Sequence, residues 1–263
     1  MIDDFSLYKG MWIQKKCLAS PQKLTKGECK SLLRRGGLLV RDVYNWDKVE
    51  ECSFWYVIKD DYKGMEELPT KVRNQVRKSL KTYEFRKVSY EEMLFLGYEL
   101  FNQSRERFGR ELEITKEEWD RRIRGKHQQL WLGFDRESGR PASFAINTLY
   151  EKYCDYTTMG FNPQFPNSTY PIYGLIYEMN RYYLENQRVS FVCDGVRSIT
   201  EHSNIQEFLI EKFKFRKAYC DIQLYYRPLL ALAVNMLFPF RKWINNKKVS
   251  AALYQEAMAR NLV

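Results

Sequence analysis

Residues 129–159 read QLWLGFDRESGRPASFAINTLYEKYCDYTTM and carry the clearest structural signal in the chain. Three runs within them, 129–134, 141–150 and 152–159, are rich in the aromatic and β-branched residues that are typical of strands. A Ser138-Gly139 turn separates the first two runs. Because strands joined by short connections pair antiparallel, the stretch predicts a three-stranded antiparallel meander.

The segments on either side of the meander add helices and further strands. Before it we expect a strand over 83–89, a helix over 90–109, and a helix over 116–125 that Thr115 and Glu118 open as a capping box. After it, Ser168 or Thr169 is expected to cap a helix with Pro171 in its first turn that ends near residue 185. There follow a short buried strand over 189–193, parallel to its neighbour, a helix over 204–214 and a strand over 217–226. This order predicts an α+β fold.

The two ends of the chain flank this core. Residues 1–82 are expected to contain a helix that ends at Gly36-Gly37, strands over 38–44 and 52–58, and a helix over 66–82. Residues 229–263 read as an apolar helix, a basic link and a short final helix. We therefore divide the chain into an N-terminal extension (1–82), a core domain (83–228) and a C-terminal helical tail (229–263).

Composition and charge narrow the class of protein. The chain has 263 residues, of which 44% are hydrophobic and 16% aromatic, and this excludes a disordered protein. Its net charge of +10 indicates either an anionic partner, such as nucleic acid, a membrane surface or a phosphorylated ligand, or simply a basic solvated surface. The densest basic patch lies on the helix over 66–82, which either contacts phosphates or faces solvent.

Cysteine and histidine usage argues against a metal site. The six cysteines are dispersed without a CxxC motif and there are two histidines, so a four-ligand zinc site is not expected. The acidic start at residues 1–4 does not read as a signal peptide, and reduced thiols in the cytoplasm are the simple interpretation. The longest apolar run, 229–240, is too short to span a bilayer.

The order of elements over 83–228 resembles the GNAT acyltransferase fold. The segment 204–216 is similar to the closing helix of that family, with Asn204 at its start and Phe215 near its end. Ile210 stands where the family often carries a tyrosine that protonates the leaving thiolate, and Lys214 stands at a glycine position. The loop 162–171, where the family places a glycine-rich cradle for the coenzyme A pyrophosphate, has no glycine.

Both departures resemble the FemAB-like branch of the superfamily, the peptidoglycan-bridge aminoacyltransferases and their relatives. Residues 73–78 (RNQVRK) look like the basic helix of this branch, and residues 191–195 (FVCDG) look like its strand ending in an Asp-x-Gly turn. The resemblance implies a mixed, mostly antiparallel GNAT-like sheet flanked by helices. It also implies direct acyl transfer from an acyl-CoA or an aminoacyl-tRNA to an amine of a cell-envelope precursor, without a metal.

The expected site lies where the last meander strand and the following parallel strand separate. Asp194 is a candidate to hold or deprotonate the amine, although it also suits a turn. His202 is a candidate base by its usual pKa, or an ordinary loop residue. Tyr156 is the third catalytic candidate, since alternation turns either it or Asp155 inward.

Binding residues are predicted around these candidates. For the donor we expect Thr158 and Met159 on the strand, the amides of Ile172, Tyr173 and Gly174 at a helix N-terminus, and Asn204, which is otherwise a helix cap. For the acceptor or for phosphates we expect Arg73, Arg77, Lys78, Arg197 and Ser198.

Alternatives to a transferase remain open. A non-catalytic binding module that keeps the fold is favoured by Ile210 and by the glycine-free loop. An RNA-binding protein would rest on charge alone, because the sequence contains no recognised RNA module. The tail over 229–248 suits either contact with the inner face of an anionic membrane or packing over the sheet.

Overall fold

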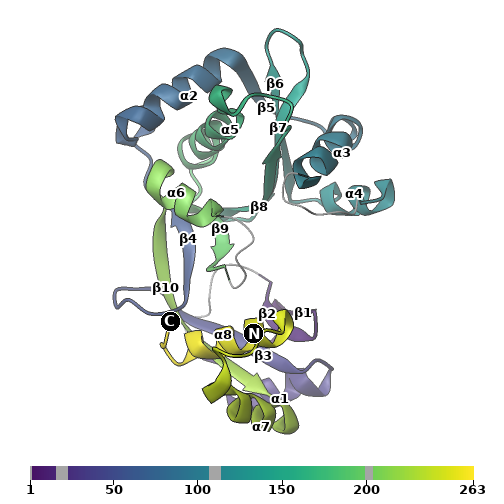
Figure 1. Cartoon of the computed structure of the whole chain (residues 1–263), viewed down its shortest axis with the longest axis vertical. Helices are drawn as coiled ribbons and strands as arrows, with labels where there is room; N and C mark the ends of the chain where they lie inside the picture. The colour runs from purple at the N-terminus through teal and green to yellow at the C-terminus, as the bar shows by residue number, and fades with distance from the viewer. Residues whose placement is uncertain (1, 16–22, 107–113, 199–203) are drawn as a thin grey trace. The chain divides into compact units, whose positions relative to one another are not determined.

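The computed structural model describes residues 2–15, 23–106, 114–198 and 204–263 and confirms the α+β fold class (Figure 1). By its internal contacts the chain forms two compact units. The central unit comprises residues 58–195 and 207–216. The terminal unit comprises residues 1–57, 196–206 and 217–263. The division into an N-terminal extension, a core domain and a C-terminal tail, which the sequence suggested, stays a prediction.

The central unit is built on the predicted meander. Its strands follow the spatial order β9-β8-β7-β6-β5, in which β5 to β8 are antiparallel and β9 is parallel to β8. The strands are β5 (Tyr83–Lys87), β6 (Gln128–Asp135), β7 (Pro141–Leu149), β8 (Tyr153–Phe161) and β9 (Phe191–Val196). The meander and the parallel strand are therefore confirmed.

Helices cover both faces of this sheet (Figure 1). Helices α2 (Thr70–Thr82) and α5 (Pro171–Asn180, continued by a π-helical segment Arg181–Asn186) lie side by side on one face. Helices α3 (Tyr90–Glu106) and α4 (Lys116–Ile123) lie on the other. Helix α6 (Ile205–Phe213) follows Asn204 in sequence and belongs mostly to the central unit.

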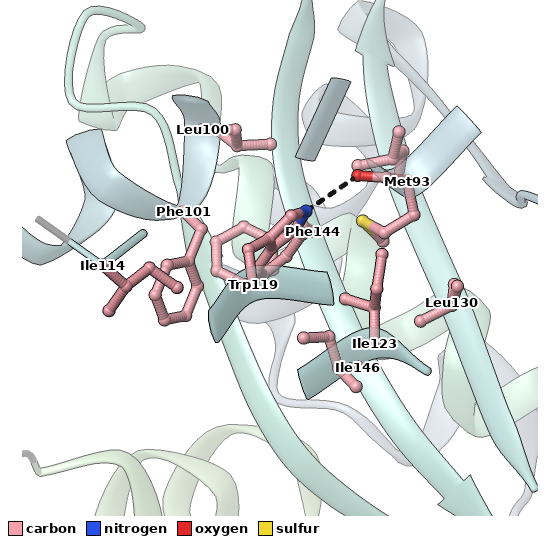
Figure 2. Close-up of a cluster of buried hydrophobic side chains, with 10 residues drawn as sticks. Met93, Leu100, Phe101, Ile114, Trp119, Ile123, Leu130, Phe144 and Ile146 are labelled. Carbon is pink, nitrogen blue, oxygen red and sulfur yellow. Dashed lines mark hydrogen bonds between the residues drawn. The ribbon is translucent and has the colours of Figure 1, made fainter. Parts of the chain in front are cut away.

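The core under α3 and α4 is a closely packed apolar cluster (Figure 2). Trp119 is fully buried there and donates its indole N–H to the Met93 carbonyl at 3.3 Å. The strand residues Leu130 and Ile146 face this cluster, which fixes the orientation of alternate residues on β6 and β7.

Helix α2 packs by one face, as its apolar stripe predicts. Val72 and Val76 are buried, whereas Arg77 and Lys78 are exposed. Near its end, Ser79 accepts a hydrogen bond from the Gly174 amide of α5 at 3.2 Å. In the chain before α2, Lys59 is buried and forms a 3.0 Å ion pair with Glu67.

Helix α5 begins at Pro171 as expected, but the predicted caps Ser168 and Thr169 are wrong. The N-cap is Tyr170, which adopts a left-handed conformation with φ of 58° and makes no side-chain cap. The Thr169 hydroxyl instead donates to the Pro166 carbonyl at 2.5 Å, a local turn that competes with capping.

The terminal unit contains the two ends of the chain. Strands β1 and β2 form a hairpin, β2 is parallel to β3, and β3 is antiparallel to β10. Its elements are β1 (Phe5–Tyr8), β2 (Met11–Gln14), α1 (Lys26–Arg34), β3 (Leu39–Lys48), β10 (Arg216–Tyr226), α7 (Pro228–Leu237) and α8 (Lys247–Ala259). Strand β4 (Trp55–Lys59) has residues in both units, and Arg216 of β10 belongs to the central one.

Candidate active site

The parallel strands β8 and β9 pair over only part of their length. The register runs from Tyr153 opposite Phe191 to Asp155 opposite Cys193, within the described part of the chain. Both strands continue beyond it, β8 to Phe161 and β9 to Val196. The sheet therefore opens at the position where the sequence places the reaction.

A β-bulge lies on β8 at the start of this opening. Ile146 of β7 pairs with Thr158, whereas the next residue, Asn147, pairs with Tyr156. Thr157 is thus the extra residue of the bulge. A bulge leaves backbone groups outside the ladder and turns the following side chains, so it is a common feature beside active sites.

A row of polar side chains crosses the sheet beside the bulge. Gln128 on β6 is opposite Thr148 on β7, which is opposite Asp155 on β8. The Thr148 hydroxyl lies 3.5 Å from Gln128 Oε1 and 3.2 Å from the Thr157 hydroxyl. Cross-strand partners share a face, so this polar row continues the face of the sheet that α3 and α4 cover.

Asp155 is the electrostatically unusual member of the row. Burial raises the pKa of its carboxyl to about 6. No hydrogen bond or ion pair to Asp155 is found among the residues that the structure describes. A partly desolvated carboxylate without a partner, poised near neutral pH, is suited to accept a proton.

A hollow of about 440 Å³ adjoins the other end of the row and includes Gln128 in its lining. Lys87 and Arg124 bring positive charge to its lining, and the Arg124 guanidinium is ion-paired with Asp120 at 2.8 Å. The hollow therefore has room and polar lining residues for part of a ligand.

The opposite face of β8 is closed. Tyr156 is buried and donates its hydroxyl proton to Asn180 Oδ1 of α5 at 2.8 Å. Burial also raises its pKa well above the usual value. Nearby, Tyr183 accepts hydrogen bonds from the indole of Trp131 at 2.8 Å and the amide of Asn147 at 3.2 Å. Tyr156 is thus held against α5, and Asp155 is the residue turned to the polar row.

The other catalytic candidates lie on or after β9. Asp194 is partly buried on β9, and its charge contributes to the raised pKa of Tyr156, so the two side chains are near each other. Gly195 has a φ of 86°, a conformation that favours glycine, but β9 continues through Asp194 and Gly195 to Val196, so the turn predicted at these two residues is wrong. His202 lies outside the described residues.

Only some of the groups that were predicted to bind the donor are available to a ligand. Thr158 and Met159 are partly exposed directly after the bulge. At the start of α5, the Tyr173 amide donates to Tyr170 O at 3.0 Å and the Gly174 amide to Ser79 Oγ at 3.2 Å, so neither is available to an anion in this conformation. Ile172 is partly buried beside them, and Asn204 is exposed immediately before α6.

The predicted basic residues differ in availability. Arg73 is ion-paired with Glu66 at 2.5 Å, whereas Arg77 and Lys78 are exposed on α2. In the terminal unit, the Arg197 guanidinium donates to the carbonyls of Ser53 at 2.8 Å and Val263 at 3.2 Å. The backbone amide of Ser198 donates to the Gln206 side chain at 2.9 Å. Arg197 therefore joins segments of the terminal unit.

Within the described ranges, no three acidic, histidine or cysteine side chains gather as a metal site would require. Nor does any helix there reach the length and apolarity needed to cross a membrane.

The meander, the parallel pair that separates and the two helical layers form a GNAT-like fold, which solved structures share. FemX has a similar structure, with a TM-score of 0.55 and 13% identity over 68% of this chain. This chain spans 63% of the FemX chain.

Two further solved structures carry the same fold. The C-terminal domain of a putative lysylphosphatidylglycerol synthetase from Agrobacterium fabrum has a TM-score of 0.53 and 12% identity, over 89% of this chain and 84% of its own. L-PGS from Bacillus licheniformis has a TM-score of 0.50 and 12% identity, over 81% of this chain and 75% of its own. No family model and no curated protein matches the sequence.

Proposed function

We propose that the chain is an N-acyltransferase that moves an acyl or aminoacyl group directly onto an amine. The observation that carries the proposal is Asp155, a carboxyl with a pKa of about 6 and no hydrogen-bond or ion-pair partner among the described residues, beside the bulge where β8 and β9 separate. The fold shared with FemX and with lysylphosphatidylglycerol synthetase domains supports a transfer reaction. An amine of a cell-envelope precursor is the acceptor that this likeness favours.

The chemistry assigned to Asp155 is proton removal. An acceptor ammonium gives one proton to the carboxylate, and the neutral amine attacks the donor carbonyl. As the new C–N bond forms, the bond from the carbonyl carbon to sulfur, or to the tRNA oxygen, breaks. The nitrogen loses its second proton, and that proton ends on the leaving sulfur or oxygen. A base with a pKa near 6 is ionised at neutral pH and is thus ready for the first step.

The donor is either an acyl-CoA or an aminoacyl-tRNA. The Tyr173 and Gly174 amides already have acceptors within the protein, which disfavours a pyrophosphate at the start of α5. The exposed cations of α2, among them Arg77 and Lys78, would suit a polyanionic donor such as tRNA.

One observation favours a second candidate, a binding module that has kept the fold. The start of α5 is closely packed: a Cβ on Gly174 would lie 2.3 Å from Phe85 Cε2 and 2.4 Å from Ser79 Oγ. The chain also has Ile210 where the resemblance predicts a tyrosine. A module would bind its ligand without turnover.

Thermal melting of the full chain with coenzyme A, acetyl-CoA, a long-chain acyl-CoA or deacylated tRNA, at two salt concentrations, separates these readings. A ligand that binds the native state raises the midpoint. A salt-insensitive shift with an acyl-CoA supports the thioester donor, and a shift with tRNA alone that high salt abolishes supports the aminoacyl donor. No shift with any of them contradicts the transferase and favours the module.

A further inference from the structure

The segment that follows β10 has two apolar faces. On the inner face, Leu230, Val234 and Phe238 pack with Leu253 and Ala257 of α8, which forms a small core within the terminal unit. Helix α7 is thereby fixed in place by one side. Its other side is not needed for this packing.

The outer face carries large apolar side chains in contact with solvent. Leu229 is 84% exposed and Trp243 is 78% exposed, and Leu232, Met236 and Phe240 between them are also exposed. From Leu229 to Phe240 these residues recur every three or four positions, which places them on one line along α7 and the short 3-10 helix Phe238–Phe240. We call these five residues the outer stripe. An exposed apolar patch of this kind marks an interaction site.

The charged residues of the segment that carries the outer stripe have one sign. Between Asp221 and Glu256 the sequence contains no acidic residue. Lys242, Lys247 and Lys248 are exposed at the end of the outer stripe and at the start of α8. An anionic partner is therefore complementary to this surface.

The outer stripe and its flanking lysines favour a lipid membrane over a second copy of the chain as the partner. A second copy of the chain that used the same face would bring like charges together, which is unfavourable. Trp, Phe and lysine together are typical of the membrane–water interface, where rings enter the headgroup region and ammonium groups contact anionic lipids. Since no described helix can cross a bilayer, the contact would be interfacial.

We propose that the outer stripe and these three lysines dock the protein on the surface of an anionic lipid bilayer, with α7 lying in the plane of the interface. This docking goes beyond the transfer reaction and does not depend on it, because it rests on the terminal unit alone.

The test is co-sedimentation of the full chain with vesicles of phosphatidylcholine and phosphatidylglycerol, against vesicles of phosphatidylcholine alone. We expect binding to the anionic vesicles that falls at high salt. Replacing the three lysines by glutamine should weaken it by about fivefold for each residue, on the order of 100-fold in all. The double variant Phe240→Ser and Trp243→Ser should lose at least tenfold.

The matched control is Phe95→Ser, since Phe95 is 83% exposed on α3 in the central unit. It should bind the vesicles as the unaltered protein does, and all variants should keep the same melting temperature. Sedimentation velocity without lipid checks for self-association. Equal binding by the Phe240/Trp243 variant, absence of binding by the unaltered protein, or a dimer that the substitutions abolish would each overturn the proposal. If the protein does not bind vesicles, the melting-temperature shifts with donor ligands and the turnover of a soluble amine are still expected, so the two proposals can fail separately.

Discussion

Replacing Asp155 by asparagine gives opposite effects on stability and on turnover if the carboxyl is the base. Burial raises its pKa from the ordinary 3.8 to about 6, so the native state disfavours the ionised form. This rise corresponds to at most about 3 kcal/mol, less whatever solvent screening relieves. Between about pH 4 and pH 6 the native chain keeps a proton that the unfolded chain has lost, so stability falls as the pH rises. Asparagine cannot ionise, so the variant does not lose stability in this way as the pH rises.

We therefore expect Asp155→Asn to be more stable than the unaltered protein at pH 7.5, by up to about 3 kcal/mol, and nearly equal to it at pH 4. Urea unfolding at a series of pH values measures both. With a donor identified, turnover at pH 7.5 should fall by about 10²–10⁴-fold. The control is Glu151→Gln, at an exposed carboxyl in the turn between β7 and β8. Unchanged stability at pH 7.5 together with full turnover would refute the assignment.

Three further substitutions test the packing and the buried charge pairing of the central unit. Tyr156→Phe should cost about 1–3 kcal/mol in urea unfolding because Asn180 loses its buried donor, while turnover changes little; a loss of turnover as large as that of Asp155→Asn would restore Tyr156 as a catalytic residue. Gly174→Ala should destabilise by about 1–3 kcal/mol, since its Cβ has no room, and an unchanged midpoint would contradict the close contact of α2 with α5. Glu67→Gln should cost about 3–5 kcal/mol at neutral pH by leaving the Lys59 ammonium buried without its partner, and a smaller cost after the further change Lys59→Met would confirm that the unpaired charge is the cause.

The order of elements was predictable because each signal was local. Alternation and a turn indicated the meander, and the stripe of Val72 and Val76 indicated which face of α2 is buried. The N-cap of α5 was not predictable in this way, because the side chain of Thr169 is used by the Pro166 carbonyl and a tyrosine adopts the left-handed conformation.

The residues of the candidate site were harder to predict from the sequence than the order of elements. Alternation leaves two opposite orientations of a strand open, and a bulge changes the register by one residue. Asp155 and Tyr156 could be told apart only once Tyr156 was seen to bond Asn180. A usable signal was present: a lone carboxylate in a run otherwise made of uncharged residues, 153–161, must either find a partner or have a raised pKa.

The discontinuity of the terminal unit has a consequence for the protein during its synthesis. Strand β3 obtains its antiparallel partner only when β10 has been made, since Leu39 is opposite Tyr226. At a synthesis rate of about 5–20 residues per second, this partner arrives roughly 10–40 s after β3. The long contiguous segment of the central unit, 58–195, is completed earlier and can fold first. Until β10 has been made, one edge of β3 lacks its strand partner and is open to pairing with other chains, so this edge is a place where a chaperone would protect the nascent protein.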